Sequence, residues 1–147
     1  MKTTRILITT ILTAIALPAF AAEKKEPSHT QVEVKIPDTS DALWTEIDVK
    51  FKALSEIVAA KKGEAVVDAA ETVEALVNAV PAKHTDLAAD KKKRVEGQAK
   101  NVARVLDELH DAAREGHWDV AARKLTQVEA ALKIIKSQLV FRAMDWK

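Results

Sequence analysis

Apolar residues recur every three or four positions through most of the chain, in four stretches separated by short breaks. The first stripe consists of Trp44, Ile47, Phe51, Leu54 and Val58, the second of Val66, Ala69 or Ala70, Val73, Leu76 or Val77 and Val80, the third of Val95, Ala99, Val102, Leu106, Leu109 and Ala113, and the fourth of Trp118, Ala121, Leu125, Val128, Leu132, Ile135 and Leu139. This spacing places each set on one face of an α-helix. The pattern predicts helices over about residues 40–62, 64–80, 88–115 and 118–142.

The breaks between the stripes carry residues that begin or end helices. A residue that can cap the first helix precedes it, namely Asp38, Thr39 or Ser40. We expect Gly63 and Gly116 to end the first and third helices and Pro81 to end the second. The two glycines stand 53 positions apart, each between two helices, which indicates two hairpins in series. Such short links favour antiparallel neighbours, so the predicted fold is an all-α, antiparallel up-down-up-down four-helix bundle. A homodimer of two hairpin pairs is the alternative architecture.

The first 21 residues have the layout of a secretory signal peptide. Lys2 and Arg5 precede an apolar run, and the small-x-small triplet 19–21 follows Pro18. Cleavage after Ala21 would send the mature chain to the periplasm. The apolar run is shorter than the roughly 20 residues that span a bilayer, and no later stretch is more apolar, so we expect no membrane span after cleavage.

Residues 22–37 are expected to form an extended polar arm in front of the bundle, which then occupies residues 38–147. Within the arm, Val32, Val34 and Ile36 alternate with polar residues before Pro37 stops the pattern. Such a run either lies along its own domain or pairs with the edge of a partner's sheet. We favour the first interpretation because short alternating runs are common.

Composition and charge exclude several classes of function. The chain has 147 residues, of which 48% are hydrophobic and 31% charged, and it has no cysteine, so disulfide scaffolds and thiolate metal sites are excluded. Cleavage removes Lys2 and Arg5 from 23 basic residues, leaving 21 basic against 22 acidic. This near-neutral chain lacks the basic surplus that nucleic-acid binding requires. It also lacks phosphate loops, nucleophile elbows and zinc-protease motifs, so we expect no enzyme.

The predicted helix stripes contain no cofactor ligand. Di-iron bundles need paired Glu-x-x-His motifs, and the nearest match here is the single Asp107-x-x-His110. Haem bundles need inward histidine or methionine ligands, but Met144 is the only methionine of the mature chain and lies beyond the stripes. We therefore expect a cofactor-free core.

Two weak candidate sites for a divalent transition metal lie at the predicted ends of the bundle, where imidazole and carboxylate groups gather. One end would hold His110, His117, Glu64 and Asp68, and the other would hold His84, Asp86 and Met144. The alternative, which we favour, is that these are ordinary surface residues.

Four motifs carry a resemblance to a known family. They are Leu43-Trp44-x-x-Ile47-Asp48-x-Lys50, Leu76-Val77-x-Ala79-Val80-Pro81-x-Lys83-x-x-x-Leu87, Val95-Glu96-x-x-x-Lys100-Asn101-Val102-Ala103 and Leu106-Asp107-x-Leu109-His110. The chain resembles small exported helical proteins whose genes accompany bacterial heavy-metal efflux systems, over about residues 43–139. The chain also resembles cytochrome b562 in its architecture, but it lacks the haem ligands of that protein. Val67 stands where the family often has a histidine.

The resemblance implies a periplasmic, cofactor-free accessory or binding protein in heavy-metal resistance or envelope stress. Its partner would then be an envelope protein or a component of a metal efflux system. The alternative is a structural or interaction module with no metal ligand, which holds a partner through the arm and the aromatic residues near the C-terminus. An enzyme of a type that the motifs do not reveal is the third reading.

Overall fold

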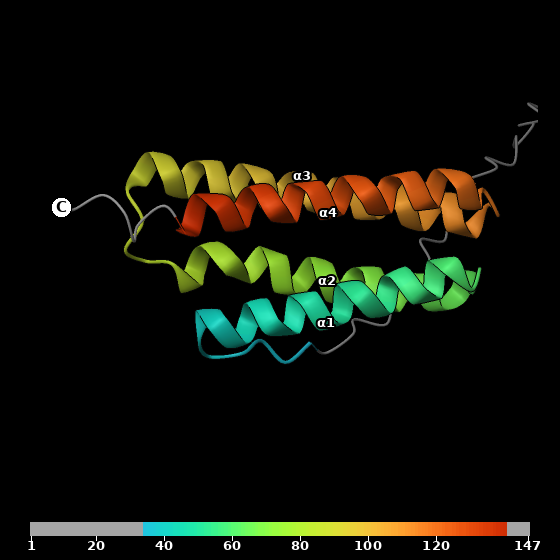
Figure 1. Cartoon of the computed structure of the whole chain (residues 1–147), viewed down its shortest axis with the longest axis horizontal. Helices are drawn as coiled ribbons and strands as arrows, with labels where there is room; N and C mark the ends of the chain where they lie inside the picture. Colours follow the sequence, from blue (N-terminus) through green and yellow to red (C-terminus); the bar gives the residue numbers. More distant parts are fainter. Residues whose placement is uncertain (1–33, 141–147) are drawn as a thin grey trace, which may run out of the picture. The chain divides into compact units, whose positions relative to one another are not determined.

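Four helices make up nearly all of the computed structural model, which describes residues 34–140 (Figure 1). They are α1 (Ser40–Ala59), α2 (Gly63–Lys83), α3 (Ala89–Arg114) and α4 (Trp118–Val140). The predicted all-α four-helix bundle is thus confirmed. The predicted signal peptide, the first part of the arm, the continuation of the fourth helix to residue 142 and Met144 lie outside the described residues.

Local sequence explains where the helices begin and end. The Thr39 hydroxyl accepts a hydrogen bond from the backbone N–H of Ala42 at 3.2 Å and so caps α1, as one of the three predicted caps. Gly116 adopts a left-handed φ of 77° just after α3, which confirms its predicted role. The N–H groups of Gly116 and His117 donate to the carbonyls of Ala113 and Ala112, the pattern of a Schellman turn.

Two predicted helix ends were wrong. Helix α1 ends at Ala59, and the residue with left-handed φ is Lys61, at 55°, while Gly63 already begins α2. The N–H groups of Lys61 and Lys62 close the same kind of Schellman turn as at Gly116. The hydrogen bonds of the last helical turn, and not the position of the nearest glycine, therefore determine which residue is left-handed. Pro81 does not end α2, which continues to Lys83. Its missing N–H removes only one helical hydrogen bond, and this bond lies in the last turn. The Pro81 side chain is buried.

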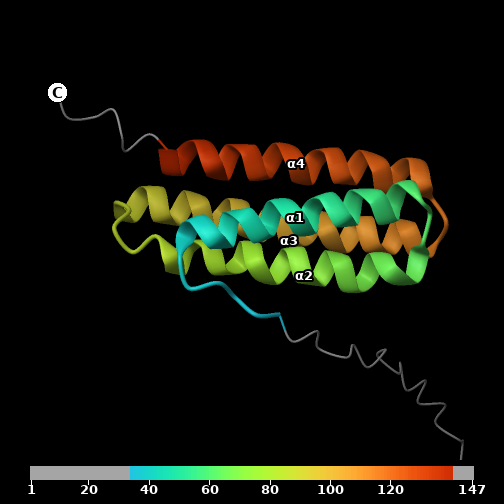
Figure 2. The same ribbon diagram turned by 60° about the horizontal axis from the view of Figure 1, so that its bottom comes forward.

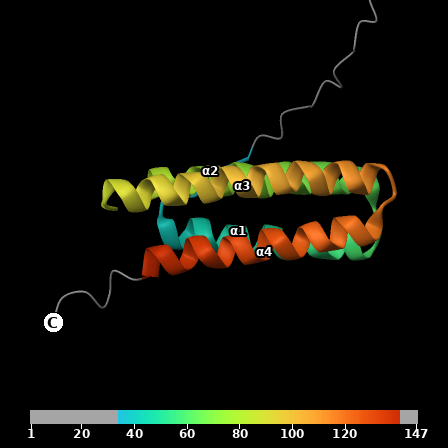
Figure 3. The same ribbon diagram turned by 90° about the horizontal axis from the view of Figure 1, so that it is seen from above.

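Consecutive helices run in opposite directions, as the colour sequence in Figure 1 shows. Contacts between their ends agree with this order. Ser40 at the start of α1 lies against His84 at the end of α2, with Oγ and Nε2 2.8 Å apart. Lys124, early in α4, donates to Glu108, late in α3. Figures 1 and 3, which are views at right angles, place the four helices at the corners of a square in chain order.

The core of the described bundle contains only apolar residues, and no polar or charged residue of this part is buried. Its largest fully buried side chains include Leu43, Ile47, Leu54, Leu76, Leu106, Leu109 and Ile135. These come from the predicted stripes or sit beside them. Val34 and Ile36 of the arm pack against this cluster half-buried, so the described end of the arm lies on its own domain. None of the described helices combines the length and apolarity needed to cross a bilayer.

The two hairpins bury equivalent positions when they are aligned on their Schellman turns, Lys61 with Gly116, an offset of 55 residues. Matched buried pairs at this offset are Ile47 and Val102, Leu54 and Leu109, Val58 and Ala113, Val66 and Ala121, Val73 and Val128, Leu76 and Ala131, Val77 and Leu132, and Val80 and Ile135. The tripeptide Val-Glu-Ala also occurs at both 73–75 and 128–130. The bundle is therefore pseudo-symmetric, and the α2–α3 and α4–α1 seams are equivalent places where one hairpin meets the other.

Candidate functional site

These two equivalent seams differ in how closely their helices pack. Helices α2 and α3 share an extensive interface, whereas α1 and α4 share the smallest interface of the four neighbouring pairs. Figure 2 shows α1 in front, with α4 along one side and α2 along the other. The α1–α4 seam thus departs from the symmetry of the bundle.

Residue size explains why this seam stays open. Trp44, Trp118 and Leu125 are half-buried along it. At the offset of 55, the closed α2–α3 seam carries Ala99, Gly63 and Ala70 in their places. Small residues let two helix backbones approach, whereas large side chains at the contact hold the axes apart. At these three positions the α1–α4 seam therefore has a bulky residue where its counterpart has alanine or glycine.

A regular spacing sets the apolar side chains along the seam. Trp44, Phe51 and Val58 are seven residues apart on α1, as are Trp118, Leu125 and Leu132 on α4. Seven residues are close to two helical turns, so each row stays on one side of its helix. Val58 and Leu132 are buried at 5% exposure, while the others are half-buried. We call this part of the α1–α4 seam, together with the pocket that Val58, Trp118 and Leu125 line, the α1–α4 groove.

Lys136 bridges one end of the groove. Its Nζ donates to both carboxylate oxygens of Asp48, at 2.6 and 2.7 Å. The same ammonium lies 5.1 Å from the centroid of the Trp44 ring, within the range of a cation–π contact. An electrostatic bridge thus joins α1 to α4 near the start of α1.

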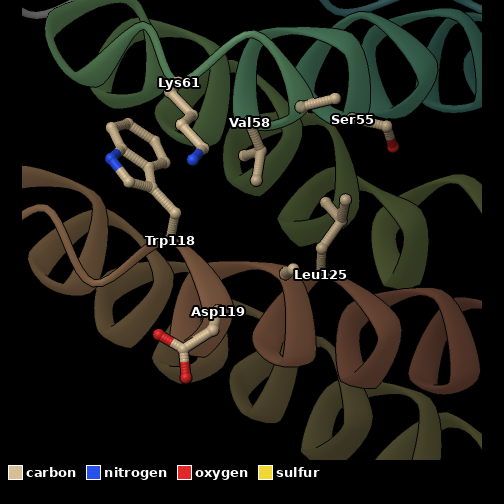
Figure 4. A pocket seen from close by; sticks show the side chains of 8 residues that line it. Ser55, Val58, Lys61, Trp118, Asp119 and Leu125 are labelled. Atoms are coloured by element: carbon tan, nitrogen blue, oxygen red, sulfur yellow. The ribbon is translucent and has the colours of Figure 1, made fainter.

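The other end of the groove opens into a pocket of about 330 Å³ (Figure 4). Its apolar lining comes from both helices and consists of Val58, Ala59, Trp118, Ala122 and Leu125. A volume of this size is at the lower end of the range found for small-molecule sites, roughly 300–1,000 Å³. The pocket can accept an apolar group.

Three polar residues border this pocket. One of them, Lys61, carries a charge that forms no ion pair with a carboxylate among the described residues. The Ser55 hydroxyl donates to the carbonyl of Phe51 at 2.9 Å. The Asp119 carboxylate pairs with Arg123 at 3.2 Å and points away from the pocket opening in Figure 4. The Lys61 ammonium, by contrast, extends into the space beside Trp118 (Figure 4). Lys61 therefore supplies the charge beside Trp118.

The first set of predicted metal residues is dispersed around one end of the bundle. His117 is exposed in the α3–α4 turn, with Nδ1 3.1 Å from a Glu115 carboxylate oxygen. The side chain of His110 is 16% exposed, and its Nδ1 lies 3.7 Å from the Asp111 carboxylate. Glu64 and Asp68 are exposed on α2. Within residues 34–140, no three histidine or carboxylate side chains form a group able to hold a metal ion.

The second set has two described members, His84 and Asp86. The Nε2 of His84 lies 2.8 Å from the Ser40 hydroxyl, Asp86 lies in the α2–α3 loop, and Met144 lies outside the described residues. Burial lowers the pKa of His84 below its usual range, while the nearby Asp41 carboxylate opposes this shift. This histidine therefore favours its neutral form at the contact between α1 and α2. Metal binding by either set stays a prediction.

Two carboxylates outside the groove have shifted pKa values. Burial between α2 and α3 raises the pKa of Glu74, and the charge of Asp107 adds to the effect. The hydrogen bond from Lys124 lowers the pKa of Glu108. Both shifts follow from helix packing.

Sequence patterning assigned the groove residues to the core. Trp44, Phe51 and Leu125 belong to the predicted apolar stripes, as the buried Leu54 does. In the structure these three residues are only half-buried. Comparing the hairpins at the correct offset would have revealed the contrast between large and small residues at the two seams.

Comparison of the chain with protein-family models, with curated proteins and with solved structures found no match.

Proposed function

We propose that the chain is an exported, cofactor-free binding protein of the bacterial envelope that holds the apolar part of its target in the α1–α4 groove. The observation that carries this proposal is the departure from pseudo-symmetry. One seam is closed by Ala99 and Ala70, while the equivalent seam is held open by Trp44 and Leu125. Exposing part of these side chains forgoes some of the stability that full burial would supply.

The groove has the two features that binding of a partly apolar ligand requires, namely apolar area and a charged group. Its lining offers apolar and aromatic area from two rigid helices, and a charge at the opening can orient what enters. The association with heavy-metal efflux or envelope stress comes from the resemblance. In that setting, we propose the groove as the surface that meets an envelope component.

Titration with the neutral, environment-sensitive dye Nile red tests this function. Ala122 is exposed on the groove side of α4, and a tryptophan there would fill the pocket. The matched control is Ala130→Trp, since Ala130 is exposed on the same helix but does not line the pocket. We expect saturable binding to the wild-type protein and to Ala130→Trp, and loss of it in Ala122→Trp. Equal binding by both variants would show that the groove is not the binding surface.

A further inference from the structure

The pocket at the open end of the groove has an apolar interior and a cationic opening. Val58 and Leu125 form opposite walls, one from each helix, and Trp118 closes the end nearest the turns (Figure 4). A flexible hydrocarbon chain can follow such walls without leaving a polar group unsatisfied. Each methylene that it buries contributes about 0.8 kcal/mol.

Lys61 is held in place at this opening by the turn that contains it. Its backbone N–H donates to the carbonyl of Val58 at 3.0 Å, and its φ is 55°. Among residues 34–140, no carboxylate pairs with its ammonium, whereas Arg123 holds Asp119. An anionic group at the opening would therefore meet a positive charge without first displacing a bound carboxylate from it.

We propose that the α1–α4 groove binds a free single-chain anionic amphiphile, with the hydrocarbon chain between Val58 and Leu125 and the anionic head at Lys61. This inference rests on the proposed function and adds the chemical class of the ligand. The charge complementarity at Lys61 favours an anionic head over a neutral or cationic one.

The probes are decanoate, decanol and decyltrimethylammonium, which share a hydrocarbon chain and differ in head-group charge. Trp146→Phe leaves Trp44 and Trp118, which both lie along the α1–α4 groove, as the two tryptophans of the chain, so the fluorescence reports on the groove. Lys61→Met removes the charge but keeps an unbranched side chain. Lys62→Met is the matched control, because Lys62 is the adjacent exposed lysine and does not line the pocket.

We expect decanoate to bind saturably below its micelle concentration and more tightly than the other two probes. Lys61→Met should weaken decanoate binding by about fivefold and leave decanol unchanged, while Lys62→Met should alter neither. Equal affinities for the three probes, or an unchanged decanoate affinity in Lys61→Met, would overturn the anionic class and leave groove binding intact. Binding of no probe, together with unaltered Nile red binding by Ala122→Trp, would overturn both proposals. Binding to anionic vesicles but not to free decanoate would likewise overturn the ligand class.

Discussion

Lys136 on α4 donates to both carboxylate oxygens of Asp48 on α1, at 2.6 and 2.7 Å. These residues are 88 positions apart, and they join the one pair of neighbouring helices that packs loosely. The seam is thus bridged by charge near Trp44 and open near Trp118. The bridge thus spans the seam at one end and leaves the pocket at the other end accessible.

A double-mutant cycle measures the strength of this bridge. Both side chains are partly exposed, so Asp48→Asn and Lys136→Met should show a coupling free energy of about 0.5 kcal/mol in urea unfolding. The coupling should fall toward zero in about 1 M salt, where exposed charges are screened. A coupling that is absent at low salt would show that the two residues do not bridge the helices in solution.

Two leucines on α4 distinguish the groove from the core. Leu132 is 5% exposed, whereas Leu125, one heptad earlier, is half-buried. Leu132→Ala should lower the free energy of unfolding by about 2–5 kcal/mol. Leu125→Ala should cost about 1 kcal/mol, because the removed side chain already contacts solvent. Equal losses in chemical denaturation would mean that the seam is closed in solution.

The two Schellman turns predict opposite effects of glycine substitution. Lys61→Gly should raise the free energy of unfolding by about 0.5–1 kcal/mol, since a left-handed φ costs a lysine more than a glycine. Gly116→Ala should lower it by about 1 kcal/mol for the same reason. Lys62→Gly is the control, because Lys62 has a φ of −93°. A gain in Lys62→Gly equal to that in Lys61→Gly would contradict this account of the turn.

His84 makes stability depend on pH in one direction. In the unfolded chain a histidine takes up its proton near pH 6.5, while burial lowers the pKa of His84 in the folded bundle. The unfolded state therefore binds more protons just below pH 6.5, so this contribution is complete above that value and is lost as the pH falls through it. His84→Gln should flatten the dependence of unfolding free energy on pH between about 7 and 5. Identical slopes for the two proteins would contradict this assignment.

The sequence predicted the helices better than it predicted the spacing between them. Spacing by three and four identifies the face of a helix that turns inward, so residues such as Leu54 and Leu109 were placed correctly in the core. The same spacing does not show how closely two neighbours approach, so Trp44 could not be told from a core residue. The approach of two helices depends on pairs of side chains distant in sequence.

The candidate sites show the same limit. Placing His110 and His117 near one end of the bundle needed only the order of the helices. Whether their side chains converge depends on helix rotation and on local partners such as Glu115, which pattern alone does not supply. The left-handed conformation of Lys61 was not predicted, because a glycine was expected at the end of the first helix. The hydrogen bonds that close the last turn of α1 place Lys61 there instead of Gly63.

Mapping of amide chemical shifts in the isotope-labelled protein, titrated with decanoate, tests the central claim most directly. We predict that the largest changes follow the groove, at Ser55 and Ala59 on α1 and at Ala122 and Leu125 on α4, with little change along the closed α2–α3 seam. Changes concentrated along the α2–α3 seam, or spread evenly over the four helices, would contradict the claim that the open seam is the binding surface.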